Sequence, residues 1–134
     1  MRIYFDTNVL ISAYVARGIC ADLLRFTLAR HEVATGEVNL LELRRVLKEK
    51  FRATAGQVAV VEAELRDQTI IPKPEAPSDL PIKDPADRWV LASAVAGGVD
   101  LLVTGDQHLL AIADRAPLPV LSPRESWEFL RKLG

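Results

Sequence analysis

The sequence contains a single cysteine, Cys20, so an intrachain disulfide is impossible and a cysteine-based zinc site has no support. It has no apolar run close to the roughly 20 residues that a membrane-spanning helix needs. Its first residues, Met-Arg-Ile-Tyr-Phe-Asp, lack the long apolar stretch and the small-residue cleavage site of a secretory signal. We therefore expect a cytoplasmic protein that has no membrane partner.

The chain also lacks an excess of charge of either sign. It has 17 lysines and arginines against 18 aspartates and glutamates, and its net charge is −1. This is not the basic footprint of most nucleic-acid-binding proteins. Setting aside the four acids discussed below leaves 14 acids against 17 basic residues, a balance of +3. Net charge therefore does not exclude an RNA partner.

Length and hydropathy predict one globular domain that spans residues 1–134. The hydrophobic fraction of 49% and the charged fraction of 26% are ordinary for such a domain, and 134 residues can bury a substantial core. Short apolar runs that predict strands are Arg2–Asp6, Glu32–Thr35, Thr69–Pro72, Leu101–Val103 and Leu118–Leu121. Helical periodicity is found in the segments that follow Thr7 or Asn8, in Ala21–Arg30, Val38–Phe51, Gly56–Leu65 and Leu109–Ala113, and after Asp84 and Ser122. This alternation predicts an α/β fold with a parallel sheet and helices on both faces.

The segment from Asp84 to Asp106 is the most informative part of the chain. Its helix has an apolar face with the 3.6-residue period, and Asp87 lies on that face one turn earlier. The apolar positions are Val90, Leu91, Ala94 and Val95. Gly97-Gly98 ends the helix, and Leu101–Val103 is typical of a buried parallel strand. The segment thus directs two carboxylates, Asp87 and Asp106, out of a packed unit.

A proline-rich stretch precedes this segment. Pro72 to Pro85 holds five of the eight prolines, which predicts an extended loop. The candidate acids lie on both sides of this loop, so we interpret it as a crossing loop within one domain.

Four acids, Asp6, Glu42, Asp87 and Asp106, are predicted to meet at one edge of the sheet. Ligands of open parallel sheets bind beyond the carboxyl ends of the strands. Asp6 ends the first strand, Asp106 follows the fourth strand, Asp87 opens a helix, and Glu42 lies in the early turns of another helix. Carboxylates gathered in this way repel each other unless a cation joins them.

A hard divalent cation fits such a site, because Mg²⁺ and Mn²⁺ prefer oxygen ligands and keep waters that substrate phosphates can replace. The cation would activate a bound water and stabilise charge on a phosphodiester, which predicts metal-assisted hydrolysis with all four acids as metal ligands and catalytic residues. Asn8 and Thr104 are candidates to orient the carboxylates or a water, and Asp84 is a third candidate to support the site.

The chain resembles the PIN-domain nucleases, specifically the toxin components of toxin–antitoxin pairs (VapC-like). The residues that carry this resemblance are Asp6-Thr-Asn-Val-Leu10, Glu42 in Leu-Leu-Glu-Leu, Asp84-Pro-Ala-Asp87 and Val103-Thr-Gly-Asp106-Gln-His-Leu-Leu110. The closing Leu121-Ser-Pro-Arg-Glu-Ser-Trp-Glu-Phe129 is also similar to the C-terminal helix of that group. Each motif alone is weak, but the four together, in order, cover essentially the whole chain.

The resemblance implies a three-layer α/β/α sandwich with a central, mostly parallel sheet of four to five strands. It also implies an Mg²⁺- or Mn²⁺-dependent endoribonuclease that acts on single-stranded or structured RNA, forms a homodimer and is inhibited by a small antitoxin. Asp6, Glu42, Asp87 and Asp106 match the family's acidic quartet by position. One departure is Gly36, which lies near the position where many relatives have a serine.

Each candidate residue also has a purely structural interpretation. Asp6 and Asp84 can cap helices, and Asp106 can serve a turn after Gly105. Glu42 can be a solvated glutamate paired with Arg45. Further residues that we interpret as structural or solvent-exposed are His31, His108, Trp127, Phe129 and the basic residues Arg44, Arg45, Lys48, Lys50 and Arg52.

Other functions fit the sequence less well. A haloacid-dehalogenase-type phosphatase needs an acid two residues after its nucleophile, whereas Asp6 is followed by Thr7-Asn8. A receiver domain needs a lysine after its last strand, and Leu118-Pro-Val-Leu-Ser-Pro offers none. The remaining alternative is a catalytically silent PIN-like module that binds RNA or protein.

Overall fold

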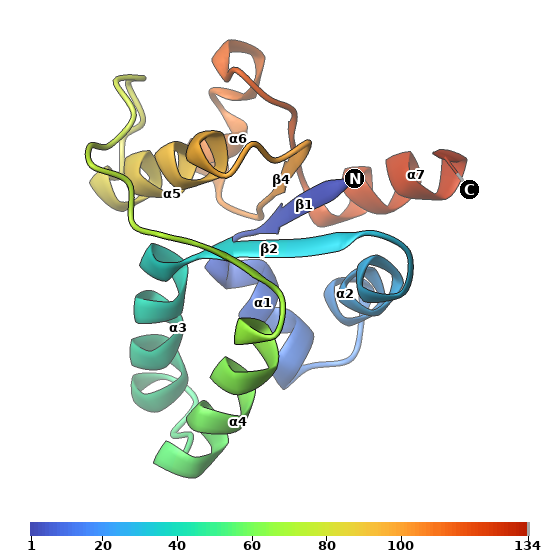
Figure 1. Cartoon of the computed structure of the whole chain (residues 1–134), viewed down its shortest axis with the longest axis vertical. Coiled ribbons are helices and arrows are strands. Elements are labelled where there is room, and N and C mark those ends of the chain that lie inside the picture. Colours follow the sequence, from blue (N-terminus) through green and yellow to red (C-terminus); the bar gives the residue numbers. More distant parts are fainter. Residues whose placement is uncertain (134) are drawn as a thin grey trace.

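A computed structural model of the chain describes residues 1–133, which form a central sheet between helical layers (Figure 1). The strands are β1 (Arg2–Phe5), β2 (Glu32–Gly36), β3 (Thr69–Ile71), β4 (Leu101–Val103) and β5 (Val120–Leu121). The helices are α1 (Thr7–Val15), α2 (Ile19–Arg30), α3 (Glu37–Glu49), α4 (Ala55–Arg66), α5 (Pro85–Ala96), α6 (Gln107–Leu110), the 3₁₀ turn η1 (Ala113–Arg115) and α7 (Pro123–Leu133).

The five described strands are all parallel and lie in the order β3-β2-β1-β4-β5. Strand β1 is central: Tyr4 is in register with Ala34 of β2 and Leu102 of β4. The chain therefore builds the sheet outward from β1 in both directions, and the strand order reverses between β1 and β4. Such a switch point leaves a crevice beyond the carboxyl ends of the two strands. The predicted three-layer α/β/α fold is confirmed.

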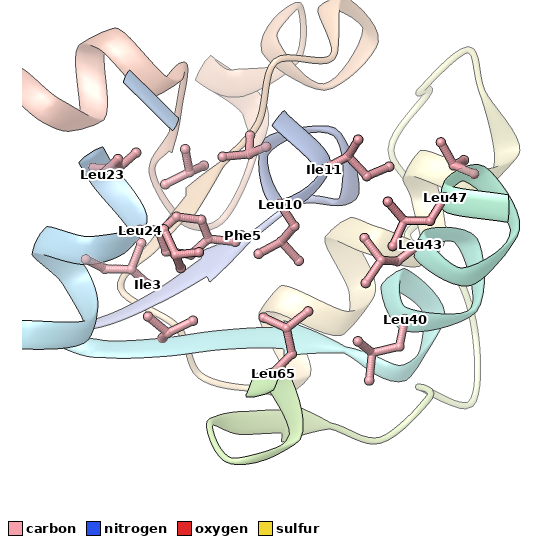
Figure 2. Close-up of a cluster of buried hydrophobic side chains, with 14 of the residues drawn as sticks. Ile3, Phe5, Leu10, Ile11, Leu23, Leu24, Leu40, Leu43, Leu47 and Leu65 are labelled. Atoms are coloured by element: carbon pink, nitrogen blue, oxygen red, sulfur yellow. The ribbon is translucent and has the colours of Figure 1, made fainter. Parts of the chain in front are cut away.

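The alternation of side chains along β1 divides the interior into two cores. Ile3 and Phe5 face a core shared with α1, α2, α3, α4 and α7, part of which is drawn in Figure 2. Tyr4 faces the opposite core, which α5, α6 and the loop residue Ile82 complete. Figure 1 shows α5 and α6 on one side of the sheet and α1 to α4 on the other.

The proline-rich loop crosses between the layers, as the sequence predicts. It runs from the end of β3 to α5 without forming a helix or strand (yellow-green in Figure 1). Hydrogen bonds fix it to α5: the Ser78 N–H donates to the Arg88 carbonyl at 3.0 Å, and Arg88 Nε donates to the Ile82 carbonyl at 3.0 Å. Ile82 is 1% exposed, so the loop contributes to the core.

Several local expectations differ from the structure. Val95 and Phe51, predicted on buried faces, are each 48% exposed. Val95 lies at the margin of the apolar arc of α5, and Phe51 lies beyond the end of α3, where Arg52 turns the chain with φ +52°. The helix expected over Leu109–Ala113 is instead the four-residue α6 followed by η1. Gly98 adopts the left-handed conformation predicted for the turn after α5, with φ +60°.

In the described part of the chain, no helix combines the length and apolar character needed to cross a bilayer.

Candidate metal centre

The candidate site lies at the carboxyl ends of β1 and β4, the two strands that flank the switch point. Asp6 directly follows β1, and Thr104 directly follows β4. The Asp6 backbone N–H donates to the carbonyl of Val103 at 3.0 Å, which extends the pairing of the strands to their ends. The fold thus positions Asp6 beside the loop that carries Asp106.

Asp6 is a buried carboxylate held by neutral donors, and it is 5% exposed. Its Oδ1 accepts hydrogen bonds from the Thr7 N–H at 2.8 Å and from Asn39 Nδ2 at 3.0 Å, and its Oδ2 accepts one from Thr104 Oγ1 at 2.7 Å. Burial raises the pKa of Asp6 to about 6, and the charges of Glu42 and Asp106 act in the same direction, against the Thr104 and Thr7 hydrogen bonds.

Asp87 is a buried acid with an unsatisfied oxygen. It occupies the third position of α5, and its inward direction follows from the apolar face of that helix. Among the described residues, its Oδ2 atom is shielded from solvent and has no hydrogen-bond partner. Burial raises the pKa of Asp87 to about 8, and the neighbouring Asp106, Asp6 and Asp84 carboxylates add to the shift. Such an oxygen requires a proton or a cation.

His108 is a site residue that sequence reasoning missed. Its Nδ1 lies 3.9 Å from Asp87 Oδ2 and 3.7 Å from Asp106 Oδ1, and its side chain is 44% exposed. Ligand atoms of Asp84, Asp87 and His108 all lie within 4.8 Å of one another. His108 is exposed, as predicted, but the expectation that it has no nearby cluster is wrong. The available signal was its place two residues after Asp106, in the first turn of a helix.

Glu42 borders the three aspartates from α3. It is half-buried, and its charge contributes to the raised pKa of Asp6. The alternative pairing with Arg45 does not form, because Arg45 NH1 bonds Glu49 at 3.2 Å. Within residues 1–133, Glu42 has no hydrogen-bond or ion-pair partner. Asp6, Glu42, Asp87 and Asp106 thus influence one another electrostatically, whereas the ligand atoms that lie within 4.8 Å of one another belong to Asp84, Asp87 and His108.

The three expected supporting residues have different contacts. Thr104 joins two acids, because its Oγ1 donates to Asp6 and accepts the Asp106 N–H at 3.0 Å. Asn8 Oδ1 accepts the Gly105 N–H at 3.2 Å, so it fixes the loop after β4. Asp84 caps α5 by accepting the Ala86 N–H at 2.9 Å.

Three acids of the site also cap helices. Asp6 caps α1, Asp84 caps α5, and Asp106 caps α6 through the backbone N–H groups of His108 and Leu109. The structural interpretation of these acids is therefore correct, but it does not exclude a role in binding. Helix N-termini also carry partial positive charge, which lowers the cost of placing three acids together.

A buried polar cluster below Asp6 was not predicted from the sequence. The Tyr4 hydroxyl bonds the amide oxygen of Asn39 and, at 2.8 Å, the hydroxyl of Ser93. Asn39 in turn donates to Asp6 and, at 2.9 Å, to Thr7 Oγ1. Tyr4, Asn39 and Ser93 belong to β1, α3 and α5, the elements that carry Asp6, Glu42 and Asp87, so the cluster connects three parts of the site.

Gly36, the departure from the family pattern, makes room for this cluster. A Cβ atom at Gly36 would lie 2.4 Å from both the Tyr4 and the Ser93 hydroxyl oxygens and 3.3 Å from Asn39 Oδ1. Side-chain hydroxyls from the neighbouring strand and helix thus fill the space that a side chain at position 36 would use.

The donor set fits a hard divalent cation. Carboxylates dominate it, the partners of Asp6 are neutral hydroxyl and amide groups, and Asp87 Oδ2 has no partner. Oxygen ligands suit Mg²⁺ and Mn²⁺, and an imidazole such as that of His108 is more readily accepted by Mn²⁺. The charge of a bound cation would offset the mutual repulsion of the Asp6, Asp87 and Asp106 carboxylates.

Comparison with known proteins places the chain in a family. A sequence model of the PIN domain matches residues 2–108. No curated protein sequence is significantly similar to the chain.

Solved structures with a similar fold include VapBC2 from Rickettsia felis bound to a DNA fragment from their promoter. It has a TM-score of 0.62 and 16% identity, over 91% of this chain and 98% of that chain. FitAcB from Neisseria gonorrhoeae gives a TM-score of 0.59 and 18% identity, over 91% and 98% of the two chains. FitAB bound to an IR36 DNA fragment gives a TM-score of 0.56 and 18% identity, over 90% of this chain and 94% of that chain. At these identities the likeness concerns the fold.

Proposed function

Because the chain belongs to the PIN-domain family, we propose that it is a metal-dependent endoribonuclease and the toxin of a toxin–antitoxin pair. The observation that carries this proposal is the unpartnered, buried Oδ2 of Asp87 in a group of acids that includes Asp6 and Asp106. A catalytically silent module has no need for such a costly arrangement.

The reaction would be hydrolysis of an RNA phosphodiester bond by in-line attack of water. A bound Mg²⁺ or Mn²⁺ would lower the pKa of that water and stabilise the charge of the phosphate. Asp6, Asp87 and Asp106 would hold the cation, with Glu42 beside them. Thr104 would keep the Asp6 carboxylate oriented, and His108 Nδ1, 3.9 Å from Asp87 and 3.7 Å from Asp106, would lie beside the cation.

The proposed partners are an RNA substrate, single-stranded or structured, a small antitoxin protein and a second copy of the chain. Support for the antitoxin comes from the fold neighbours, which include VapBC2 and FitAB complexes. The homodimer and the RNA substrate rest on the family resemblance of the acid-bearing motifs. The cytoplasmic location remains a prediction from the sequence.

A cleavage assay tests the activity. Purified protein, freed of any bound antitoxin, is incubated with labelled single-stranded RNA and Mn²⁺. We expect Asp6→Asn to reduce the rate by more than about 100-fold, since it removes a ligand rather than an outer-shell group. Asp67→Asn is the matched control, because Asp67 is an exposed acid at the end of α4, and it should cleave like wild type.

Two results would contradict the proposed activity. One is equal cleavage by wild type and Asp6→Asn, which would point to a contaminating nuclease. The other is no cleavage by folded, antitoxin-free wild type, which would favour the alternative of a silent PIN-like module that binds RNA or protein.

A further inference from the structure

A groove between α3 and α5 opens beside the acids. Its volume is about 450 Å³, and its walls include Val38, Leu41 and Glu42 of α3, Lys73 after β3, and Trp89 and Val90 of α5. Glu42 belongs to both the groove and the acidic group. An RNA strand whose scissile phosphate lies at the acids can therefore enter this groove with its adjoining nucleotide.

The groove walls combine an aromatic ring, exposed aliphatic surface and a cation. Trp89 is half-buried, and Leu41 is 65% exposed. Lys73 Nζ lies 4.8 Å from the centre of the Trp89 ring. In proteins that bind single-stranded nucleic acid, bases stack on aromatic side chains, and nearby cations contact the phosphates.

Charge pairing distinguishes Lys73 from the other cation of the groove. Arg44 is already paired with Glu62 through two hydrogen bonds, of 2.6 and 2.9 Å. Lys73, by contrast, has no carboxylate partner in the part of the chain that the structure describes, and it rests on the indole face. A cation–π contact at an exposed site is weak, so a phosphate can draw the amine away and free the ring for stacking.

We propose that this groove binds the nucleotide adjoining the scissile phosphate, with its base on Trp89 and a phosphate at Lys73. The proposal rests on the proposed RNA cleavage and extends it by naming residues that determine specificity. A protein segment would gain from the exposed Leu41, whereas a nucleotide has both a base that can stack on the indole and a phosphate that can pair with Lys73. The charge of Lys73 thus favours the nucleotide as the occupant.

The test measures RNA binding without cleavage. A fluorescein-labelled single-stranded RNA decamer is titrated with protein in Ca²⁺, and anisotropy gives the Kd. Stacking of one base predicts a loss of roughly 5- to 150-fold for Trp89→Leu. Lys73→Gln should reduce the slope of log K against log salt by about one. Thermal unfolding verifies that each variant retains its fold, and Mn²⁺ titration verifies that it retains the metal affinity of its acidic site.

Trp127→Leu is the matched control, because Trp127 is the other tryptophan of the chain. It packs against Phe26 with ring centres 5.6 Å apart, beside the core that Ile3 and Phe5 face. Its RNA affinity should match wild type. The Trp127→Phe variant leaves Trp89 as the sole indole, and its fluorescence should be quenched by the RNA.

Each result decides between the two proposals. If wild type cleaves RNA but Trp89→Leu and Lys73→Gln bind RNA with unchanged affinity, the groove proposal is overturned and the nuclease proposal stands. Absence of both cleavage and binding in wild type overturns both. Loss of antitoxin affinity in Trp89→Leu with unchanged RNA affinity assigns the groove to a protein and also overturns the proposal.

Discussion

The two faces of β1 differ in what they bury. Ile3 and Phe5 lie among leucines and valines in one core, part of which is drawn in Figure 2. Tyr4 lies on the other face, where its hydroxyl meets Asn39 and Ser93 just below Asp6. The first face stabilises the fold through apolar area alone, whereas the second uses packing to hold polar groups in fixed positions. Stability and site geometry should therefore respond to different substitutions.

The largest expected effect comes from the apolar face. Leu10 is fully buried there, and Leu10→Ala should lower the free energy of unfolding by about 2–5 kcal/mol. Mn²⁺ affinity of the folded fraction should not change. Urea unfolding and Mn²⁺ titration at low temperature measure the two quantities. A parallel loss of metal affinity would show that the two faces are not independent.

An intermediate effect is expected from the polar face. Tyr4→Phe removes the hydroxyl that fixes Asn39 but keeps the ring in its core. Outer-shell substitutions cost 10- to 100-fold in metal affinity or activity, and we expect a loss of about that size in Mn²⁺ affinity. Isothermal titration with Mn²⁺ measures it.

Tyr14→Phe is the control for this substitution, because Tyr14 is the only other tyrosine and its hydroxyl bonds Glu64 on α4 at 2.9 Å. Its Mn²⁺ affinity should equal that of wild type. If both variants bind Mn²⁺ equally well, Tyr4 has only a packing role.

A further effect is a pH dependence of stability in EDTA. Asp6 and Asp87 have raised pKa values of about 6 and about 8, so the folded chain retains protons that the unfolded chain releases near pH 4. Stability of the metal-free protein should therefore fall as pH rises from about 4 to about 8. The Tm in EDTA should therefore decrease between pH 5 and pH 8.

Asp87→Asn should be more stable than wild type in EDTA at pH 8, and its Tm should depend less on pH. Saturating Mn²⁺ should remove the advantage of the variant. A marked loss of stability in Asp87→Asn under EDTA would instead mean that this acid serves mainly to stabilise the start of α5.

The elements that local sequence predicted well are those whose signal is periodic. The buried run Leu101–Val103 and the apolar face before Gly97 identify β4 and α5, and the rule for parallel sheets then places Asp6 and Asp106 at one edge. The prediction of the acids followed from strand ends and helix starts. These rules give no distance between side chains, so they could not predict that ligand atoms of Asp84, Asp87 and His108 lie within 4.8 Å of one another.

What the sequence could not predict depends on contacts between distant elements. From the sequence, Tyr4 is an ordinary core aromatic. The partners of its hydroxyl, Asn39 and Ser93, lie 35 and 89 residues away in the chain. His108 was misjudged because its neighbour Asp87 belongs to another helix. The groove at Trp89 and Lys73 exists only because α3, α5 and the residues after β3 pack side by side.

The most direct measurement is the anomalous diffraction of crystals grown with Mn²⁺. A manganese ion coordinated by Asp6, Asp87 and Asp106, with Glu42 in direct or water-mediated contact, is the expected result. Manganese bound only elsewhere on the protein, or none at saturating concentration in well-ordered crystals, would contradict a shared cation site.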